Sequence, residues 1–327
     1  MSRTGRDPDS TQKDGLFRID WNQHAFDAQQ ALLMASARPT LPQAPAYAAA
    51  LVDAGHAQTE FGVLRFHDRP VGYVFVERRP FFRWVSSFRI YRGPVWLDNS
   101  LPGTVQREFF QMIRQRYRFR TGRPVTFHPE MSDTPANRRH LAVSGFRRIA
   151  HGYSTIWLDL APALEPLRAS LDAKWRNRLG QSERNNLQLQ VDTDGSSLDW
   201  LIERHEEHMA ARNYRGPSRA LLTGMMHHGR QTRLITILSA LRGGEPVAAV
   251  LITRHGSSAT YFVGWNGPEG RRLRAHHFLL WQAVRMLQDE KVRWFDLGGI
   301  NNADAAKVAR FKSGLSGDHT TLVGGYT

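Results

Sequence analysis

The sequence predicts an α/β protein built from two similar halves, and three observations carry this prediction. Extended apolar segments alternate with helical segments along the chain. The hairpin turn at residues 68–72, D-R-P-V-G, is echoed by G-E-P-V-A at residues 244–248. A helix follows each hairpin at a similar distance, over 103–120 and 271–290. The spacing favours a duplicated α/β unit with a cleft between the halves, although two unrelated α/β domains can share such a layout.

The first half begins with a short apolar strand and a helix that has proline near its start and glycine at its end. Its second helix carries Phe109, Met112 and Ile113 at helical spacing. The predicted elements are, in order, strand 16–20, helix 41–55, a strand pair within 61–79, strand 88–97, helix 103–120, and strands 124–129 and 153–160.

The second half repeats this plan after a short basic helix at 171–186 that connects the two halves. In that helix, Trp175 and Leu179 form the apolar side, and four cations surround them: Lys174, Arg176, Arg178 and Arg184. Such a helix can lie against phosphate oxygens, but it is equally consistent with a solvated surface anchored by one tryptophan. The remaining elements are a strand pair within 233–256, strand 258–266, helix 271–290 and strand 293–297.

Composition limits the possible functions. The chain has 327 residues, a formal net charge of +14 and a pI near 10.7, which favours a polyanionic partner such as nucleic acid or nucleotide phosphate, unless the charge serves only solubility. Cysteine is absent, which excludes disulfides, thiolate catalysis and cysteine-ligated zinc, and fits a cytoplasmic protein. No apolar run is long enough to span a membrane, and residues 1–15 are polar, so we expect a disordered N-terminus without a signal peptide.

Several common catalytic patterns are missing. His205 and His208 share a helix face, but they stand in H-E-E-H rather than H-E-x-x-H, and no third ligand is evident, so we expect no metal. The sequence has no G-x-S-x-G elbow, no P-loop lysine and no dinucleotide fingerprint. In acetyl-CoA-dependent acyltransferases, a glycine-containing loop that precedes a helix binds the pyrophosphate. The segment N-G-P-E-G-R-R-L-R-A at the matching place has the wrong glycine spacing, although it is consistent with a phosphate-binding loop of another kind.

One lysine near the C-terminus is unusual. The chain has 39 arginines and only five lysines, yet Lys312 stands in a glycine-bounded F-K-S-G segment that we interpret as a turn after a buried strand. A position that needed only positive charge would carry arginine in this chain, so the lysine indicates a requirement for a compact ammonium. The alternative is an ordinary surface lysine.

Four segments of the second half resemble the FemABX family of aminoacyl-tRNA-dependent peptidyl transferases. They are K-W-R-N-R-L-G-Q-S-E-R-N-N-L-Q-L-Q-V from residue 174, H-M-A-A-R-N-Y-R-G from 208, the helix and strand ending in F-D-L-G-G-I at 300, and A-R-F-K-S-G-L-S-G-D from 309. The first half is similar only in layout, with L-P-Q-A-P-A-Y resembling the start of a family helix. The resemblance implies two tandem GNAT (acyl-CoA N-acyltransferase)-like domains with mixed central sheets. Residues 16–155 plus 305–327 would form the first domain and 156–304 the second, with 320–326 as the last strand of the first.

The resemblance also implies roles for individual residues. Phe311 and Lys312 fall on the family's phenylalanine and catalytic lysine, which lie beside the aminoacyl ester, and Tyr261 falls near a tyrosine that lines the site. Arg212 falls on an arginine that meets acceptor phosphate. The remaining residues that we expect to bind substrate are Tyr214, Arg176, Arg178, Trp175, Arg271 and Arg272.

The expected function is therefore transfer of an amino acid from aminoacyl-tRNA to the amine of a peptide, peptidoglycan precursor or small molecule, without a cofactor and with a monomer favoured. An aminoacyl ester is already activated, so such an enzyme needs no covalent nucleophile. Asp296 is a candidate proton acceptor if it faces the cleft, and otherwise caps the G-G-I turn. Family members that act on nucleotide-linked cell-wall precursors carry a lysine soon after the aromatic residue of the first-domain helix. Here Tyr47 is followed by A-A-A-L, which argues against a nucleotide-linked acceptor. The alternatives are an N-acyltransferase that uses an acyl-CoA or carrier thioester, and a nucleic-acid-binding module without catalysis.

Overall fold

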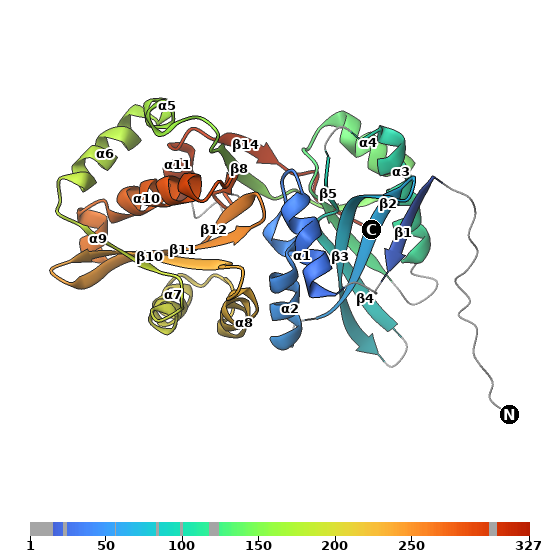
Figure 1. The fold of residues 1–327 in the computed structure, drawn as a ribbon, viewed down its shortest axis with the longest axis horizontal. Coiled ribbons are helices and arrows are strands. Elements are labelled where there is room, and N and C mark those ends of the chain that lie inside the picture. The colour runs from blue at the N-terminus through green and yellow to red at the C-terminus, as the bar shows by residue number, and fades with distance from the viewer. Residues whose placement is uncertain are drawn as a thin grey trace.

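The computed structural model describes residues 16–21, 25–55, 57–82, 85–98, 101–117, 124–300 and 306–327, so the expected disorder of residues 1–15 lies outside the described residues. Each half contains one mixed sheet, and the two halves lie side by side (Figure 1). The prediction of two α/β halves is confirmed.

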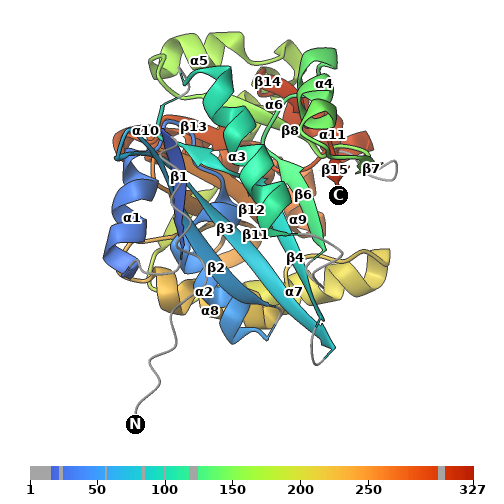
Figure 2. The ribbon, with the colours of Figure 1, turned by 90° about the vertical axis from the view of Figure 1, so that its right-hand side faces the viewer.

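The first sheet has the strand order β1-β2-β3-β4-β6-β15-β7, with β5 paired to β3. Helix α3 covers one face of this sheet (Figure 2), while α1 and α2 lie toward the second half (Figure 1). The strands are β1 (Phe17–Trp21), β2 (Gln58–Phe66), β3 (Arg69–Phe82), β4 (Val85–Gly93), β5 (Val95–Trp96), β6 (Val125–Pro129), β7 (Arg148–Ala150) and β15 (Gly325–Tyr326). The helices are α1 (Phe26–Ala35), the 3-10 helix η1 (Leu41–Gln43), α2 (Pro45–Asp53), α3 (Gly103–Arg116) and α4 (Pro135–Val143).

The second sheet has the order β14-β8-β13-β12-β11-β10-β9. Its strands are β8 (Ser154–Asp159), β9 (Gln188–Asp192), β10 (Ile235–Arg242), β11 (Glu245–His255), β12 (Ser258–Asn266), β13 (Trp294–Asp296) and β14 (Asp318–Thr321). Its helices are α5 (Leu164–Ser170), α6 (Ala173–Glu183), α7 (Leu198–Arg212), α8 (Arg219–Gly229), α9 (Pro268–Arg272), α10 (Ala275–Asp289) and α11 (Ala306–Ser313).

The two halves share one strand plan. In the first, the antiparallel series β1 to β4 is followed by β6, which runs parallel to β4, with α3 between them in sequence. In the second, the antiparallel series β9 to β12 is followed by β13, which runs parallel to β12, with α10 between them. Parallel neighbours need such a crossover helix, so the equal order supports a duplicated unit.

The boundary at the C-terminus differs from our expectation that residues 305–327 complete the first domain. Strand β14 pairs with β8 in the second sheet, and only β15 pairs with β6 and β7 in the first. Helix α11 also stays with the second half, because Phe311 and Leu315 pack into the core that contains Trp175 of α6. The chain therefore changes sheets between β14 and β15, later than the resemblance implied.

Glycines allow the two chain crossings between the sheets to pass close together. A Cβ at Gly152 would lie 1.6 Å from the carbonyl oxygen of Leu322, and one at Gly324 would lie 2.1 Å from that of Ala150. Gly324 also has a φ of 102°, which a side chain rarely tolerates. The crossing of β7–β8 over β14–β15 thus requires glycine at both positions.

An apolar contact between α2 and α8 joins the halves on their lower side in Figure 1. Ala46, Ala50 and Leu51 of α2 pack in one cluster with Leu222 and Met225 of α8. Gly224 lets the helices approach, since a Cβ there would lie 3.1 Å from the Cβ of Ala50. Because both faces are small and apolar, the halves form one packed structure rather than two tethered domains.

Candidate functional site

Lys312 lies at the end of a helix and is buried at the junction of the halves. Helix α11 places its side chain inward, with 7% of the residue exposed. The Nζ atom donates a hydrogen bond of 2.9 Å to the carbonyl oxygen of Gly299 and lies 5.4 Å from the ring centroid of Tyr261. The expected turn is thus the last turn of a helix, and the alternative of a solvent-exposed surface lysine is wrong.

The surroundings of Lys312 weaken its hold on a proton. Burial lowers the pKa of Lys312 to about 8, while the nearby carboxylate of Asp296 acts in the opposite direction. At neutral pH the amine is still mostly protonated. The site therefore offers an ammonium that is largely removed from water, where a charge acts more strongly than it does in solvent.

The carbonyl that holds Lys312 belongs to a glycine turn after β13. Gly298 has a φ of 73°. At Gly299, a Cβ would lie 2.9 Å from Cε2 of Tyr153. The turn is fixed by Asp296, whose Oδ1 accepts a hydrogen bond of 2.8 Å from the backbone N–H of Gly298.

The second role considered for Asp296, capping of this turn, is therefore confirmed. The side chain is fully buried and forms an ion pair of 2.6 Å with Nη1 of Arg92. Burial alone would raise the pKa of Asp296, but Arg92, Thr155 and the Gly298 N–H outweigh it and hold the pKa below its ordinary value. A carboxylate bound in this way is a poor proton acceptor.

Tyr261 faces Lys312 from β12, next to an irregularity in the sheet. The register between β11 and β12 shifts at Leu251 and Ile252, so Tyr261 pairs with Ile252 while Val263 pairs with Leu251. Such a bulge redirects a side chain, and bulges are common beside active sites. Gly264 leaves room for the phenol, because a Cβ there would lie 2.0 Å from the hydroxyl oxygen of Tyr261. Burial raises the pKa of Tyr261, so the phenol stays protonated and can donate.

Phe311 connects the lysine to the basic helix α6. Its ring centroid lies 4.9 Å from that of His277 and 6.1 Å from that of Trp175. Trp175 is only 3% exposed, so it supports Phe311 and does not offer a face to a ligand, contrary to its expected role. Burial, with the charge of Arg178 next, lowers the pKa of His277 to about 3, which places the Arg178 guanidinium near this cluster.

Tyr214 lies just beyond the end of α7, beside a group of cations. Its hydroxyl lies 3.1 Å from Nδ1 of His208. Burial lowers the pKa of His208, and Arg212 and Arg271 lower it further, so both guanidinium groups lie close to this pair. Burial first and Tyr214 second raise the pKa of Tyr261. Of these residues, Tyr261 is the one with a direct contact to Lys312 among the described residues, and His208 with Tyr214 links Arg212 and Arg271 to one another.

Three of the expected binding residues have partners outside this group, and Arg271 is one of them, because it donates a hydrogen bond of 2.7 Å to the carbonyl oxygen of Asn266. Arg176 donates a hydrogen bond of 2.7 Å to the carbonyl oxygen of Ala169. Arg272 is 73% exposed in its side chain and forms an ion pair of 3.0 Å with Glu269. Neither Arg176 nor Arg272 has a contact that links it to Lys312 within the described part of the chain.

No sequence pattern marks Arg92, Tyr153, Thr155 or His276 as part of this site. Arg92 pairs with Asp296 across the halves, and its guanidinium stacks over Tyr153 at 5.3 Å. His276 lies beside Phe311 and contacts the Trp265 carbonyl oxygen at 2.9 Å through Nε2. For His276, the pair of adjacent histidines at the start of α10 is the one sequence feature that could have indicated a role.

The described residues contain no group of three or more His, Cys, Asp or Glu side chains that could hold a metal ion. None of the helices within them is long and apolar enough to cross a membrane.

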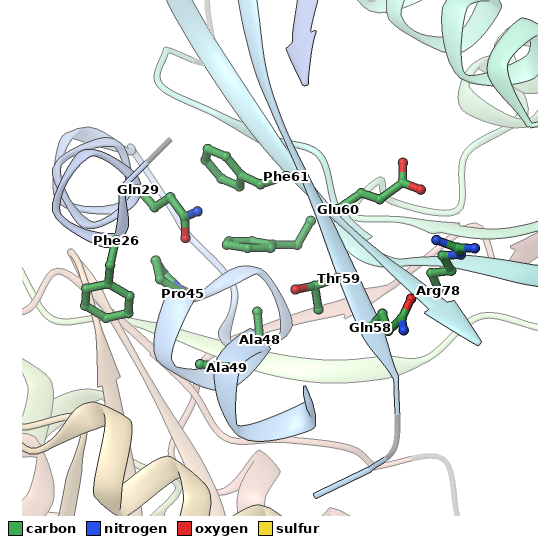
Figure 3. A pocket seen from close by; sticks show the side chains of 11 residues that line it. Phe26, Gln29, Pro45, Ala48, Ala49, Gln58, Thr59, Glu60, Phe61 and Arg78 are labelled. Carbon is green, nitrogen blue, oxygen red and sulfur yellow. The ribbon is translucent and has the colours of Figure 1, made fainter. Parts of the chain in front are cut away.

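A separate cavity of about 410 Å³ lies in the first half, between α1, α2 and the β2–β3 hairpin (Figure 3). Phe26, Pro45 and Phe61 line it, one from each element, but its wall is more polar than apolar, and Gln29 and Thr59 point toward its interior. None of its lining residues is among those that surround Lys312.

Comparisons with known proteins agree with this architecture. Residues 168–313 match the family model of the acetyltransferase (GNAT) domain. The chain is similar to a solved structure of FemX with a TM-score of 0.78 and 9% identity, over 94% of this chain and 96% of FemX. No curated protein sequence matches the chain.

Two further structures are similar at lower scores. The C-terminal domain of a putative lysylphosphatidylglycerol synthetase from Agrobacterium fabrum has a TM-score of 0.56 and 16% identity, over 92% of this chain and 90% of that domain. A tandem GNAT protein from the clavulanic acid biosynthesis pathway has a TM-score of 0.51 and 14% identity, over 94% of this chain and 98% of its own. At these identities the likeness shows the fold, which is that of FemX and of two tandem GNAT-like domains. The match over residues 168–313 and the shared fold agree on a GNAT-type domain in the second half.

Proposed function

We propose that this chain, which has the fold of FemX, moves an amino acid from aminoacyl-tRNA to the amine of an acceptor and forms an amide bond. The observation that carries the proposal is the buried ammonium of Lys312, which lies between the glycine turn and Tyr261 at the junction of the halves. The acceptor is a peptide, a peptidoglycan precursor or a small molecule that bears an amine.

The chemistry requires little beyond orientation and charge. The acceptor amine attacks the ester carbonyl carbon, a new C–N bond forms, and the carbonyl oxygen becomes negative. Lys312 and the phenol of Tyr261 are suited to stabilise that oxygen, and one such donor contributes about 3 kcal/mol to catalysis. The C–O ester bond then breaks, and the proton lost by the amine ends on the terminal ribose hydroxyl of the tRNA. No described carboxylate is assigned as the base.

The cations near the site suit the phosphates of the two substrates. The charge of Arg178 lowers the pKa of His277 beside Phe311, and the charges of Arg212 and Arg271 lower the pKa of His208 beside Tyr214, in each case after burial. By the FemABX resemblance, Arg212 meets acceptor phosphate, and we assign Arg178 and Arg271 to the acceptor end of the tRNA. The net charge of +14 supports a polyanionic partner. We further propose a cytoplasmic monomer without a cofactor.

A second candidate is an N-acyltransferase that uses an acyl-CoA or carrier thioester. The match of residues 168–313 to the acetyltransferase (GNAT) domain favours it. Against it stands the segment before α10, where the glycine spacing of a coenzyme A loop is missing and Arg274 adopts a left-handed conformation with a φ of 59°.

Transfer of radiolabelled amino acid from charged tRNA to a panel of amines separates the two candidates. We expect label on an acceptor amine, and we expect ribonuclease treatment of the tRNA to abolish it. Transfer that survives ribonuclease, or that occurs only with acyl-CoA, would refute the proposal.

The matched variants are Lys312→Ala and Lys307→Ala, since Lys307 lies exposed on the same helix. Lys312→Ala should abolish turnover without unfolding the protein, and Lys307→Ala should leave turnover unchanged. Equal turnover in both variants would remove Lys312 from the mechanism.

A further inference from the structure

A buried ion pair connects the two halves directly behind the glycine turn. Arg92, at the end of β4, is 4% exposed, and Asp296, at the end of β13, is fully buried. Nη1 of Arg92 lies 2.6 Å from Oδ2 of Asp296, although 204 residues separate them in sequence. A buried charge pair costs desolvation energy and is weak evidence for stability, so its presence suggests another role.

The first half holds Arg92 firmly. Glu130 accepts two hydrogen bonds from its guanidinium, at 2.7 Å from Nε and 2.8 Å from Nη2. Thr40 donates a hydrogen bond of 2.7 Å to the carbonyl oxygen of Arg92, and the residue has a φ of 52°. A non-glycine residue in this conformation persists only where its surroundings fix it.

Asp296 passes this constraint to the turn that carries Lys312. One of its oxygens, Oδ2, meets Arg92, while Oδ1 accepts hydrogen bonds from the Gly298 N–H and from the hydroxyl of Thr155. One residue further along, Gly299 accepts the hydrogen bond from Lys312. Arg92, Asp296, the glycine turn and Lys312 therefore form one continuous series of short contacts.

We infer that Asp296, held by Arg92, is a positioning residue that fixes the Gly298–Gly299 turn beneath Lys312 and keeps the buried amine charged. The inference rests on the proposed function only for the meaning of Lys312, since the geometry and the charge of the amine can be measured without a substrate.

Four titratable or charged groups surround Lys312 on the described elements. Tyr261 faces it from β12, Asp296 lies behind the turn from β13, and Tyr153 precedes β8 against Gly299 with Arg92 stacked over it. Burial raises the pKa values of both tyrosines, so at neutral pH the phenols are uncharged. Among these groups, Asp296 is thus the source of negative charge near the amine.

Titration of Lys312 by NMR tests the inference directly. Lysine labelled with ¹³C at Cε gives one titrating signal for each of the five lysines, and Lys312→Arg assigns the relevant one. In the wild-type protein we expect a midpoint near 8. In Asp296→Asn the midpoint should fall by about one pH unit, because an opposite charge at short range favours the protonated amine.

Glu130→Gln is the matched control, because it also removes a charged partner of Arg92 but leaves Asp296 ionised. We expect its Lys312 midpoint within half a pH unit of wild type, while its thermal denaturation reports a comparable loss of stability. The inference is overturned if Asp296→Asn leaves the midpoint unchanged, or if Glu130→Gln moves it equally. If the Lys312 midpoint shifts as expected but the wild-type protein has no transfer activity, the proposed function is wrong and the positioning role of Asp296 stands.

If Asp296→Asn does not fold, Thr155→Val and Thr155→Ser decide the question, since both keep every charge. Valine removes the hydroxyl that fixes Asp296, and serine retains it. Turnover should fall at least fivefold in Thr155→Val with little change in KM, and Thr155→Ser should restore it. Equal turnover in the two variants would contradict a positioning role for this network.

Discussion

Replacement of Lys312 by methionine should make the protein inactive and more stable. The amine is buried, and its pKa of about 8 lies well below the ordinary 10.5, so keeping it protonated at neutral pH destabilises the folded state. The difference corresponds to about 3 kcal/mol at pH 7, since each pKa unit represents about 1.4 kcal/mol. Methionine has a similar length and no charge. It loses the hydrogen bond to Gly299, which contributes about 1 kcal/mol, so we expect a net gain of about 2 kcal/mol.

The sign of the effect depends on pH in a defined way. Because the pKa of Lys312 is lower in the folded state, its side chain binds more protons in the unfolded chain between about pH 8 and 10.5, and the contribution of Lys312 to the free energy of unfolding rises with pH across this range. The advantage of Lys312→Met should therefore shrink by about 2 kcal/mol between pH 7 and pH 10. Stability that favours the variant at neutral pH is the usual signature of a residue kept for function.

Urea denaturation of the wild type, Lys312→Met and Lys307→Met at pH 7 and pH 10 measures these differences. Lys307→Met serves as the control, because that side chain is exposed on the same helix, and its stability should match wild type at both values. The reasoning is refuted if Lys312→Met is less stable than wild type at pH 7, or if its advantage is the same at pH 10.

Three further predictions concern the surroundings of the site. Gly264→Ala should lower turnover at least tenfold, because its Cβ would lie 2.0 Å from the Tyr261 hydroxyl. The double variant Gly264→Ala with Tyr261→Phe should have an initial transfer rate at least equal to that of Tyr261→Phe alone. Arg92→Met should reduce the free energy of unfolding by about 3–5 kcal/mol, because it leaves Asp296 buried without its cation. Urea denaturation measures this change, and an unchanged free energy of unfolding would show that the ion pair is dispensable. Binding of aminoacyl-tRNA, measured by filter retention, should weaken as the salt concentration rises. Arg271→Ala should reduce the slope of log K against log salt concentration by about one, which corresponds to one released counterion. An unchanged slope would show that Arg271 does not contact phosphate.

The general layout of the fold could be predicted from sequence because it depends on local signals. The turn at 68–72 and its counterpart at 244–248 lie between strands that pair as expected, β2–β3 and β10–β11. The helix predicted at 103–120 contains α3, and the one predicted at 271–290 contains the end of α9 and all of α10, with a break at Arg274 that the pattern did not predict. Hydrophobic period and turn residues carry this information, since they act over a few residues only.

The path of the C-terminus could not be predicted in the same way. Residues 318–321 and 325–326 are both short strands, and nothing in their composition says which sheet each one joins. That choice depends on Phe311 and Leu315, which hold α11 against the second core and so deliver β14 to the edge beside β8. Burial of apolar surface from distant elements decides it.

Sequence patterns alone were enough to predict two similar α/β halves, their two hairpins and Lys312 as the unusual cation. Its signal was chemical, a lysine in a chain that otherwise uses arginine. The three-dimensional arrangement was needed to see that the amine is buried, that Tyr261 faces it, and that Arg92 pairs with Asp296 across 204 residues. The physical reason is that burial, charge pairing and the resulting pKa depend on which groups meet in space, and no local pattern along the chain specifies such meetings.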